Sequence, residues 1–144
     1  MRKIIFISVL LVGIFASWHC EGFNIFRKIK IRGHVFTVEI AASPSEKEKG
    51  LGYRNSMPKD YGMLFVFENK EKYSFWMKGM RFPLDFLWID GNRIVDITQK
   101  VPVATGDTLP VCEPRVPVDK VLELNAGVVE NLGISAGDTI TPLD

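Results

Sequence analysis

Two acidic side chains that interrupt apolar runs are the residues of this sequence best suited to chemistry. Asp85 lies within PLDFLW and Glu123 within VLELN. An unpaired charge near a core is costly, so each carboxylate is expected to have a cationic partner, with Arg54 as the first choice. One interpretation is a structural ion pair. The other is a pair of carboxylates that performs acid–base chemistry in a pocket.

The segment SFWMKGMRFPLDFLWID, residues 74–90, contains two tryptophans, three phenylalanines and two methionines. If its start is a strand, Phe75 and Met77 face a core while Trp76 and Lys78 share the opposite face. A lysine beside a tryptophan is typical of a pocket wall or of a cation stacked on the ring. The candidate ligand-binding residues are therefore Arg54, Met57, Trp76, Met77, Lys78, Arg81, Asp85 and Glu123.

Methionines cluster in the same region, where Met57, Met77 and Met80 lie near aromatic residues. Exposed thioethers in an exported protein could hold Cu(I), which is a soft cation. They could also line an adaptable apolar groove for a peptide or lipid, or fill gaps in a core.

The usual catalytic motifs are missing from the sequence. His19 and His34 are the only histidines, and there is no HExxH, CxxC, GxSxG or phosphate-binding glycine loop. We therefore assign no catalytic residue, no metal ligand and no cofactor. The 18 basic and 17 acidic residues nearly cancel, which argues against a nucleic-acid partner.

The N-terminus predicts export. Arg2 and Lys3 precede an uncharged run at 4–16, which is typical of a signal and shorter than the roughly 20 residues of a membrane span. We interpret residues 1–19 as a signal peptide or signal anchor of a periplasmic or otherwise extracytoplasmic protein. Cleavage after Ala16, lipidation at Cys20 and an uncleaved anchor are the alternatives, the last two attaching the chain to a membrane.

Two details bear on Cys20. Ser-Trp-His precedes it, where a lipobox has small residues. A disulfide between Cys20 and Cys112 is a further alternative if the protein is in an oxidising compartment.

Residues 25–144 are predicted to form one mainly β domain. Alternation over 26–41 around Gly33 indicates a hairpin, the apolar run at 62–67 a strand buried on both faces, and the segment 86–101 a hairpin turning at Asp90-Gly91. Short strands at close spacing favour a compact β-sandwich or barrel.

Two short helices are expected beside the strands. Ser43, Pro44 and Glu46 form a capping box for the first helix, which ends at Gly50 or Gly52. Asn125 is the expected cap of the second helix, which ends at Gly133.

Several longer motifs resemble a known family. GLGYRNSMP, GMLFVF, FWMKGMRFPLDFLWID, VLELNAG and GISAGD are similar, in this order and spacing, to motifs of the DUF192 family. The resemblance covers about residues 35–142. It implies a jelly-roll-like β-sandwich with short helices at its edges and an export or lipoprotein signal, and it brings no established activity.

These observations lead to three functional hypotheses. The leading one is a non-catalytic binding or assembly domain at the cell envelope, whose partner is an envelope protein or a small ligand. The alternative is a hydrolase of envelope material that uses Asp85 and Glu123. The third is a soft-metal protein that binds Cu(I).

Overall fold

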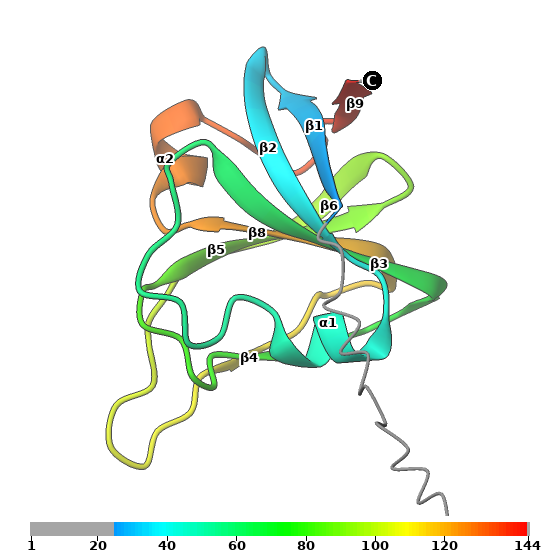
Figure 1. Cartoon of the computed structure of the whole chain (residues 1–144). Helices are drawn as coiled ribbons and strands as arrows, with labels where there is room; N and C mark the ends of the chain where they lie inside the picture. Colours follow the sequence, from blue (N-terminus) through cyan, green and yellow to red (C-terminus); the bar gives the residue numbers. More distant parts are fainter. Residues whose placement is uncertain (1–24, 144) are drawn as a thin grey trace, which may run out of the picture.

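The computed structural model describes residues 25–143, which fold mainly into β-strands (Figure 1). In chain order the elements are β1 (Phe26–Ile31), β2 (His34–Ala41), α1 (Pro44–Lys49), β3 (Tyr61–Glu71), β4 (Phe75–Trp76), β5 (Leu84–Asp90), β6 (Arg93–Val101), β7 (Val111–Cys112), β8 (Val118–Asn125), α2 (Val128–Leu132) and β9 (Thr141–Leu143). The predicted mainly β class with two short helices is confirmed.

The expected signal segment 1–19 and the lipidation candidate Cys20 lie outside the described residues. Within 25–143, none of the helices has the length and apolar character needed to cross a bilayer.

Seven strands form one mixed sheet in the order β6-β5-β8-β3-β2-β1-β9, and β4 pairs with β7 in a second, small sheet. The pair β2–β3 is parallel and is connected through α1, whereas the other strand pairs are antiparallel. The large sheet ends at β6 and β9 and does not close into a barrel. The small sheet packs on one of its faces, which gives the sandwich character.

The predicted first hairpin is confirmed. Its turn is made by Arg32 and Gly33, with φ of +48° and +85°, and Ile31 pairs with His34 across it. Two residues with positive φ give the turn a twist that matches the flanking strands. Ile29 and Ile31 are buried, as the alternation predicts.

Helix α1 begins and ends as expected. The Glu46 amide donates to the Ser43 hydroxyl at 3.3 Å, and the Ser43 amide donates to the Glu46 carboxylate at 2.8 Å. Gly50 is the C-cap. None of the six helical residues is buried, so the caps rather than a buried face define this helix.

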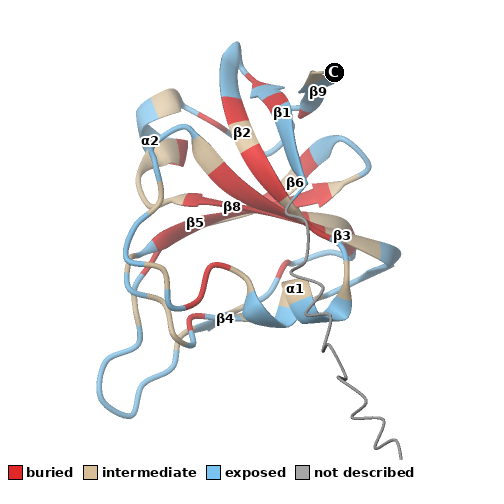
Figure 2. Cartoon of the chain, viewed as in Figure 1, coloured by how far each residue is buried: buried red, intermediate tan, exposed pale blue. Residues whose placement is uncertain are grey.

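Strand β5 lies inside the protein and is buried on both faces (Figure 2). Leu87 and Ile89 belong to the core on one face, and Phe86 and Trp88 to the core on the other. The small sheet covers the second face, where the Phe75 ring lies 5.7 Å from the rings of both Phe86 and Trp88.

Two local predictions are wrong. Asn125 does not cap α2, because its amide donates to the backbone carbonyls of Met57 at 3.0 Å and Pro58 at 3.1 Å. The N-cap is Gly127, which has no side chain to bond. The second predicted hairpin forms with its turn one residue later than expected, because Asp90 pairs with Arg93. Gly133 ends α2 as predicted.

Candidate ligand-binding pocket

The strand registers place the two predicted carboxylates on opposite faces of the large sheet. Glu123 is paired directly with Met63 on β3 and with Phe86 on β5, and Met63 is paired with Glu39 on β2. Residues paired across neighbouring strands share a face, so these four side chains form a row on what we call the pocket face. Asp85 precedes Phe86 and points to the other side. Asp85 and Glu123 therefore cannot act together on one substrate.

Asp85 is fully buried, and no cation among residues 25–143 forms a salt bridge with it. Its Oδ1 accepts from the Lys100 amide at 2.8 Å, and its Oδ2 accepts from the Val129 amide at 3.0 Å. Lys100 lies in a bulge of β6 with φ +53°, and Val129 is in the first turn of α2. Two backbone donors thus stabilise the carboxylate, which holds the bulge and the helix in place.

Arg54 was expected to pair with Asp85 or Glu123, and its partner is instead Glu39. The guanidinium donates to both carboxylate oxygens, at 2.8 and 3.0 Å. Only 7% of Glu39 is exposed. Glu39, Arg54 and α1 line a shared hollow, so the chain after β2 covers this end of the strand.

Glu123 is the buried carboxyl that has no partner in the part of the chain that the structure describes. It is 6% exposed, and among the described residues no donor or acceptor reaches its Oε2. Burial raises the pKa of Glu123 from the ordinary 4.5 to about 8, and the positive charge of Arg54 opposes the rise. Most Glu123 side chains are therefore protonated at neutral pH.

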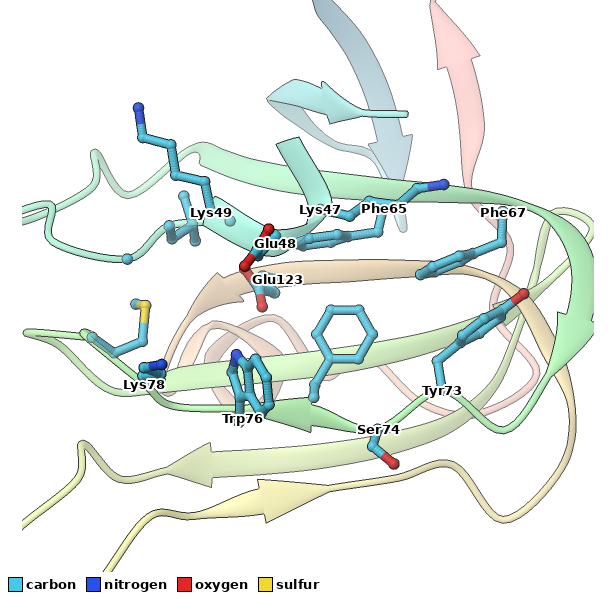
Figure 3. Close-up of a pocket in the computed structure, with 15 residues that line it drawn as sticks. Lys47, Glu48, Lys49, Phe65, Phe67, Tyr73, Ser74, Trp76, Lys78 and Glu123 are labelled. Atoms are coloured by element: carbon cyan, nitrogen blue, oxygen red, sulfur yellow. The ribbon is translucent and has the colours of Figure 1, made fainter. Parts of the chain in front are cut away.

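Glu123 forms part of a pocket of about 400 Å³ on the pocket face, shown in Figure 3. Its walls are aromatic: Phe65, Phe67, Tyr73, Phe75 and Trp76. Phe67 and Tyr73 stack with their centroids 3.6 Å apart. Small-molecule sites are usually concave and mostly apolar, with a few polar groups that fix the ligand.

Charged side chains surround the aromatic walls. Lys78 Nζ lies 5.8 Å from the centroid of Trp76, which is one of the two arrangements that the sequence suggested. Lys47 Nζ lies 4.6 Å from the centroid of Phe67. Lys49 and Glu48 also line the pocket, so its rim carries three lysines and one glutamate.

The other sequence candidates lie elsewhere. Met77 is completely buried, Met57 lines a separate hollow beside α2, and exposed Arg81 donates to Asn55. Met80 is the methionine that lines the aromatic pocket. Met57 and Met80 both pack against the core cluster that contains Met77, but they line different hollows. The described residues hold no cluster of His, Cys, Asp and Glu suited to a metal ion.

Three of the candidate ligand-binding residues, Trp76, Lys78 and Glu123, line this pocket. The candidates did not include most of the other residues that line it. The missed charges belong to α1, whose capping box predicted a helix without indicating what it covers. The missed rings of Phe67 and Tyr73 lie at the end of β3 and beyond it.

Two loops behind the pocket are held together by a contact that requires glycine. The Tyr53 amide donates to the Gly79 carbonyl at 2.8 Å. Gly79 has φ +72°, and a Cβ built there would lie 2.9 Å from the Tyr53 ring. Gly79 directly follows Lys78, so this contact positions the rim of the pocket.

Gly79→Ala should therefore destabilise the protein more than Gly91→Ala. Both glycines have positive φ, so each alanine carries a backbone cost of about 1–2 kcal/mol. Gly91 has nothing within 4 Å of an added Cβ, which makes it the matched control. Urea melts measure both costs, and equal values would contradict the packing role of Tyr53.

The chain is similar to a family and to solved structures. The DUF192 family model, described as "Uncharacterized ACR", matches residues 27–142. A Sinorhizobium meliloti 1021 protein described as a "putative transcription regulator" is 38% identical, with a TM-score of 0.75 over 83% of this chain and 95% of that one. A Novosphingobium aromaticivorans DSM 12444 protein of unknown function is 26% identical, with a TM-score of 0.76 over 85% and 89% of the two chains. No curated protein matches the chain.

Proposed function

Because the chain belongs to the DUF192 family, whose description assigns no activity, we propose from its pocket that it is a non-catalytic binding module of the cell envelope. Its ligand is a small molecule with an apolar body, held in the aromatic pocket. The observation that carries this proposal is the buried Glu123 oxygen, which has no partner among the described residues. A buried polar atom without a partner costs stability, and a bound ligand can supply the missing bond.

The two other hypotheses find less support. A hydrolase that uses two carboxylates needs both beside one substrate. Asp85 faces the opposite side of the sheet, and Glu39 lines a different hollow from Glu123. A Cu(I) site needs several sulfurs at one accessible point, whereas Met77 is buried and Met57 and Met80 line different hollows.

The Sinorhizobium protein is described as a "putative transcription regulator", but we do not propose DNA binding for this chain. Proteins that bind DNA neutralise its phosphates with an excess of lysine and arginine. Here the 18 basic and 17 acidic residues leave a formal charge of +1.

The envelope location rests on the apolar run at 4–16 after Arg2 and Lys3. We expect the full chain in the membrane or exported fraction of expressing cells, and a chain without residues 1–19 in the soluble cytoplasm. Fractionation with immunoblotting measures both. Full chain in the soluble cytoplasm would contradict export. Cys20→Ser should release the protein from membranes if Cys20 is lipidated, and unchanged retention would indicate an uncleaved anchor.

Methionine methyl signals provide a test of the pocket. Met80 lines the aromatic pocket, and Met57 lines the hollow beside α2 and serves as an internal control. With ¹³C-methyl methionine in the full chain, alkyl amines, alkyl carboxylates or monosaccharides at millimolar concentration should shift Met80 and leave Met57 in place. No shift of Met80 with any probe would contradict a ligand pocket. A shift caused by duplex DNA instead would favour the regulator interpretation.

A further inference from the structure

We propose that the pocket binds a small zwitterion, with an N–H-bearing cationic end on Glu123 and an anionic end at the lysines of the rim. This inference rests on the proposed ligand-binding function and specifies the chemistry of the ligand. Three features of the pocket carry it: an acid and three lysines that have no charged partner within residues 25–143, and the ring faces between them.

The inner end of the pocket suits a cation with hydrogens to donate. Glu123 Oε2 is buried among aromatic rings and has no partner among the described residues. Arg54, the nearby cation, already donates to both oxygens of Glu39. An ammonium or guanidinium group would give Glu123 a charge-assisted hydrogen bond and would contact the faces of the rings.

The outer end of the pocket suits an anion. Lys47, Lys49 and Lys78 line it, and none of them lies within 4.0 Å of a carboxylate oxygen in the described part of the chain. Glu48 is the acidic residue on the same rim, so the rim keeps an excess of positive charge. Two of the lysines already lie beside pocket rings, at Phe67 and Trp76.

The two ends require a ligand with an apolar spacer between opposite charges. Three probes of matched length separate the requirements: 6-aminohexanoate carries both charges, hexylamine only the cation and hexanoate only the anion. Binding to the full chain is measured by titration calorimetry and by the Met80 methyl shift. We expect 6-aminohexanoate to bind about tenfold or more tightly than either other probe, since each lost end removes a charge-assisted contact.

Variants assign each end of the ligand. Glu123→Gln should weaken 6-aminohexanoate and hexylamine about tenfold and leave hexanoate unchanged. The double variant Lys49→Gln with Lys78→Gln should bind 6-aminohexanoate more weakly than the wild type does. It should bind hexylamine at least as tightly as the wild type does. Glu68→Gln, which changes an exposed acid outside the pocket, and Lys59→Gln, which changes a lysine of the hollow beside α2, are the matched controls.

Proton release gives a readout that does not depend on any variant. An ammonium group that binds the ionised form of Glu123 displaces the carboxyl proton, so calorimetry at pH 7 in buffers of different ionisation heat should show net proton release on binding. Besides Arg54, the titratable groups near Glu123 come from α1, from β4 and its flanks and from β7: Lys47, Glu48, Lys49, Tyr73, Lys78 and Cys112.

The outcomes separate this inference from the proposed function. Hexanoate binding as tightly as 6-aminohexanoate, unaffected by Glu123→Gln and without proton release, would overturn the zwitterion while the pocket remained a binding site. If Met80 shifts with none of the three probes, the zwitterion is overturned. The wider panel of carboxylates and monosaccharides then decides whether the pocket binds any other class of ligand.

Discussion

Asp85→Asn should lower the free energy of unfolding by about 2–4 kcal/mol at pH 7. The substitution preserves the size of the side chain but replaces one oxygen by an amide NH₂. That group would face the backbone N–H of Lys100 or of Val129, both of which now donate to the carboxylate. One buried donor would lose its acceptor. Denaturant melts measure the loss, and hydrogen exchange should show faster opening at these two amides.

Asp90→Asn on the same strand is the control. Asp90 lies at the end of β5, and its side chain is 38% exposed and paired with Lys70 at 2.5 Å. An exposed pair of this kind contributes little to stability, so this variant should unfold almost like the wild type. If Asp85→Asn were equally mild and the two amides stayed protected, the structural role of Asp85 would be wrong.

Glu123→Gln should become increasingly stabilising, relative to the wild type, as the pH rises. Burial raises the pKa of Glu123 to about 8 in the folded protein, against an ordinary value of 4.5. Between these values the folded chain retains a proton that the unfolded chain has released, so raising the pH favours unfolding. The loss is complete above pH 8 and amounts to about 3–5 kcal/mol in the wild type. Glutamine cannot ionise, so the Glu123→Gln variant does not lose this stability as the pH rises.

Urea melts at pH 5, 7 and 8.5 test this dependence. The difference between Glu123→Gln and the wild type should be small at pH 5 and largest at pH 8.5. Glu48→Gln, which makes the same substitution at the exposed rim of the same pocket, is the matched control. Parallel pH curves for the wild type and Glu123→Gln would contradict a buried, unpaired Glu123. Asp85→Asn and Glu123→Gln together separate the roles of the two acids: Asp85 stabilises the fold, whereas Glu123 destabilises it at high pH.

Local patterns in the sequence were sufficient for most of the strands and turns. The hairpin at Gly33, the capping box at Ser43 and the stop at Gly133 depend on interactions between residues a few positions apart, so the sequence carries them directly. The alternation at Phe75 and Trp76 correctly predicted which side chain is exposed. The long motifs identified the family, which the family match over 27–142 confirms.

Contacts between residues that are distant in the sequence could not be predicted from local patterns. Asp85 and Glu123 were the partners expected for Arg54 from the sequence, whereas the fold brings its guanidinium to Glu39. Whether Asp85 and Glu123 share a site depends on the register between β5 and β8, and a shift of one residue would reverse the answer. Asp85 meets the start of α2 because the two segments, 44 positions apart, pack together.

The pocket depends on the same long-range geometry. Its lining comes from α1, β3, β4 and β8 and from the loops that follow the first three of them. None of these segments indicates a pocket by itself. Local composition predicts that a side chain such as Glu123 is buried, because it lies between leucines. Whether this side chain has a hydrogen-bond partner depends on which distant side chains the fold places beside it, since hydrogen bonds act only over a few ångströms.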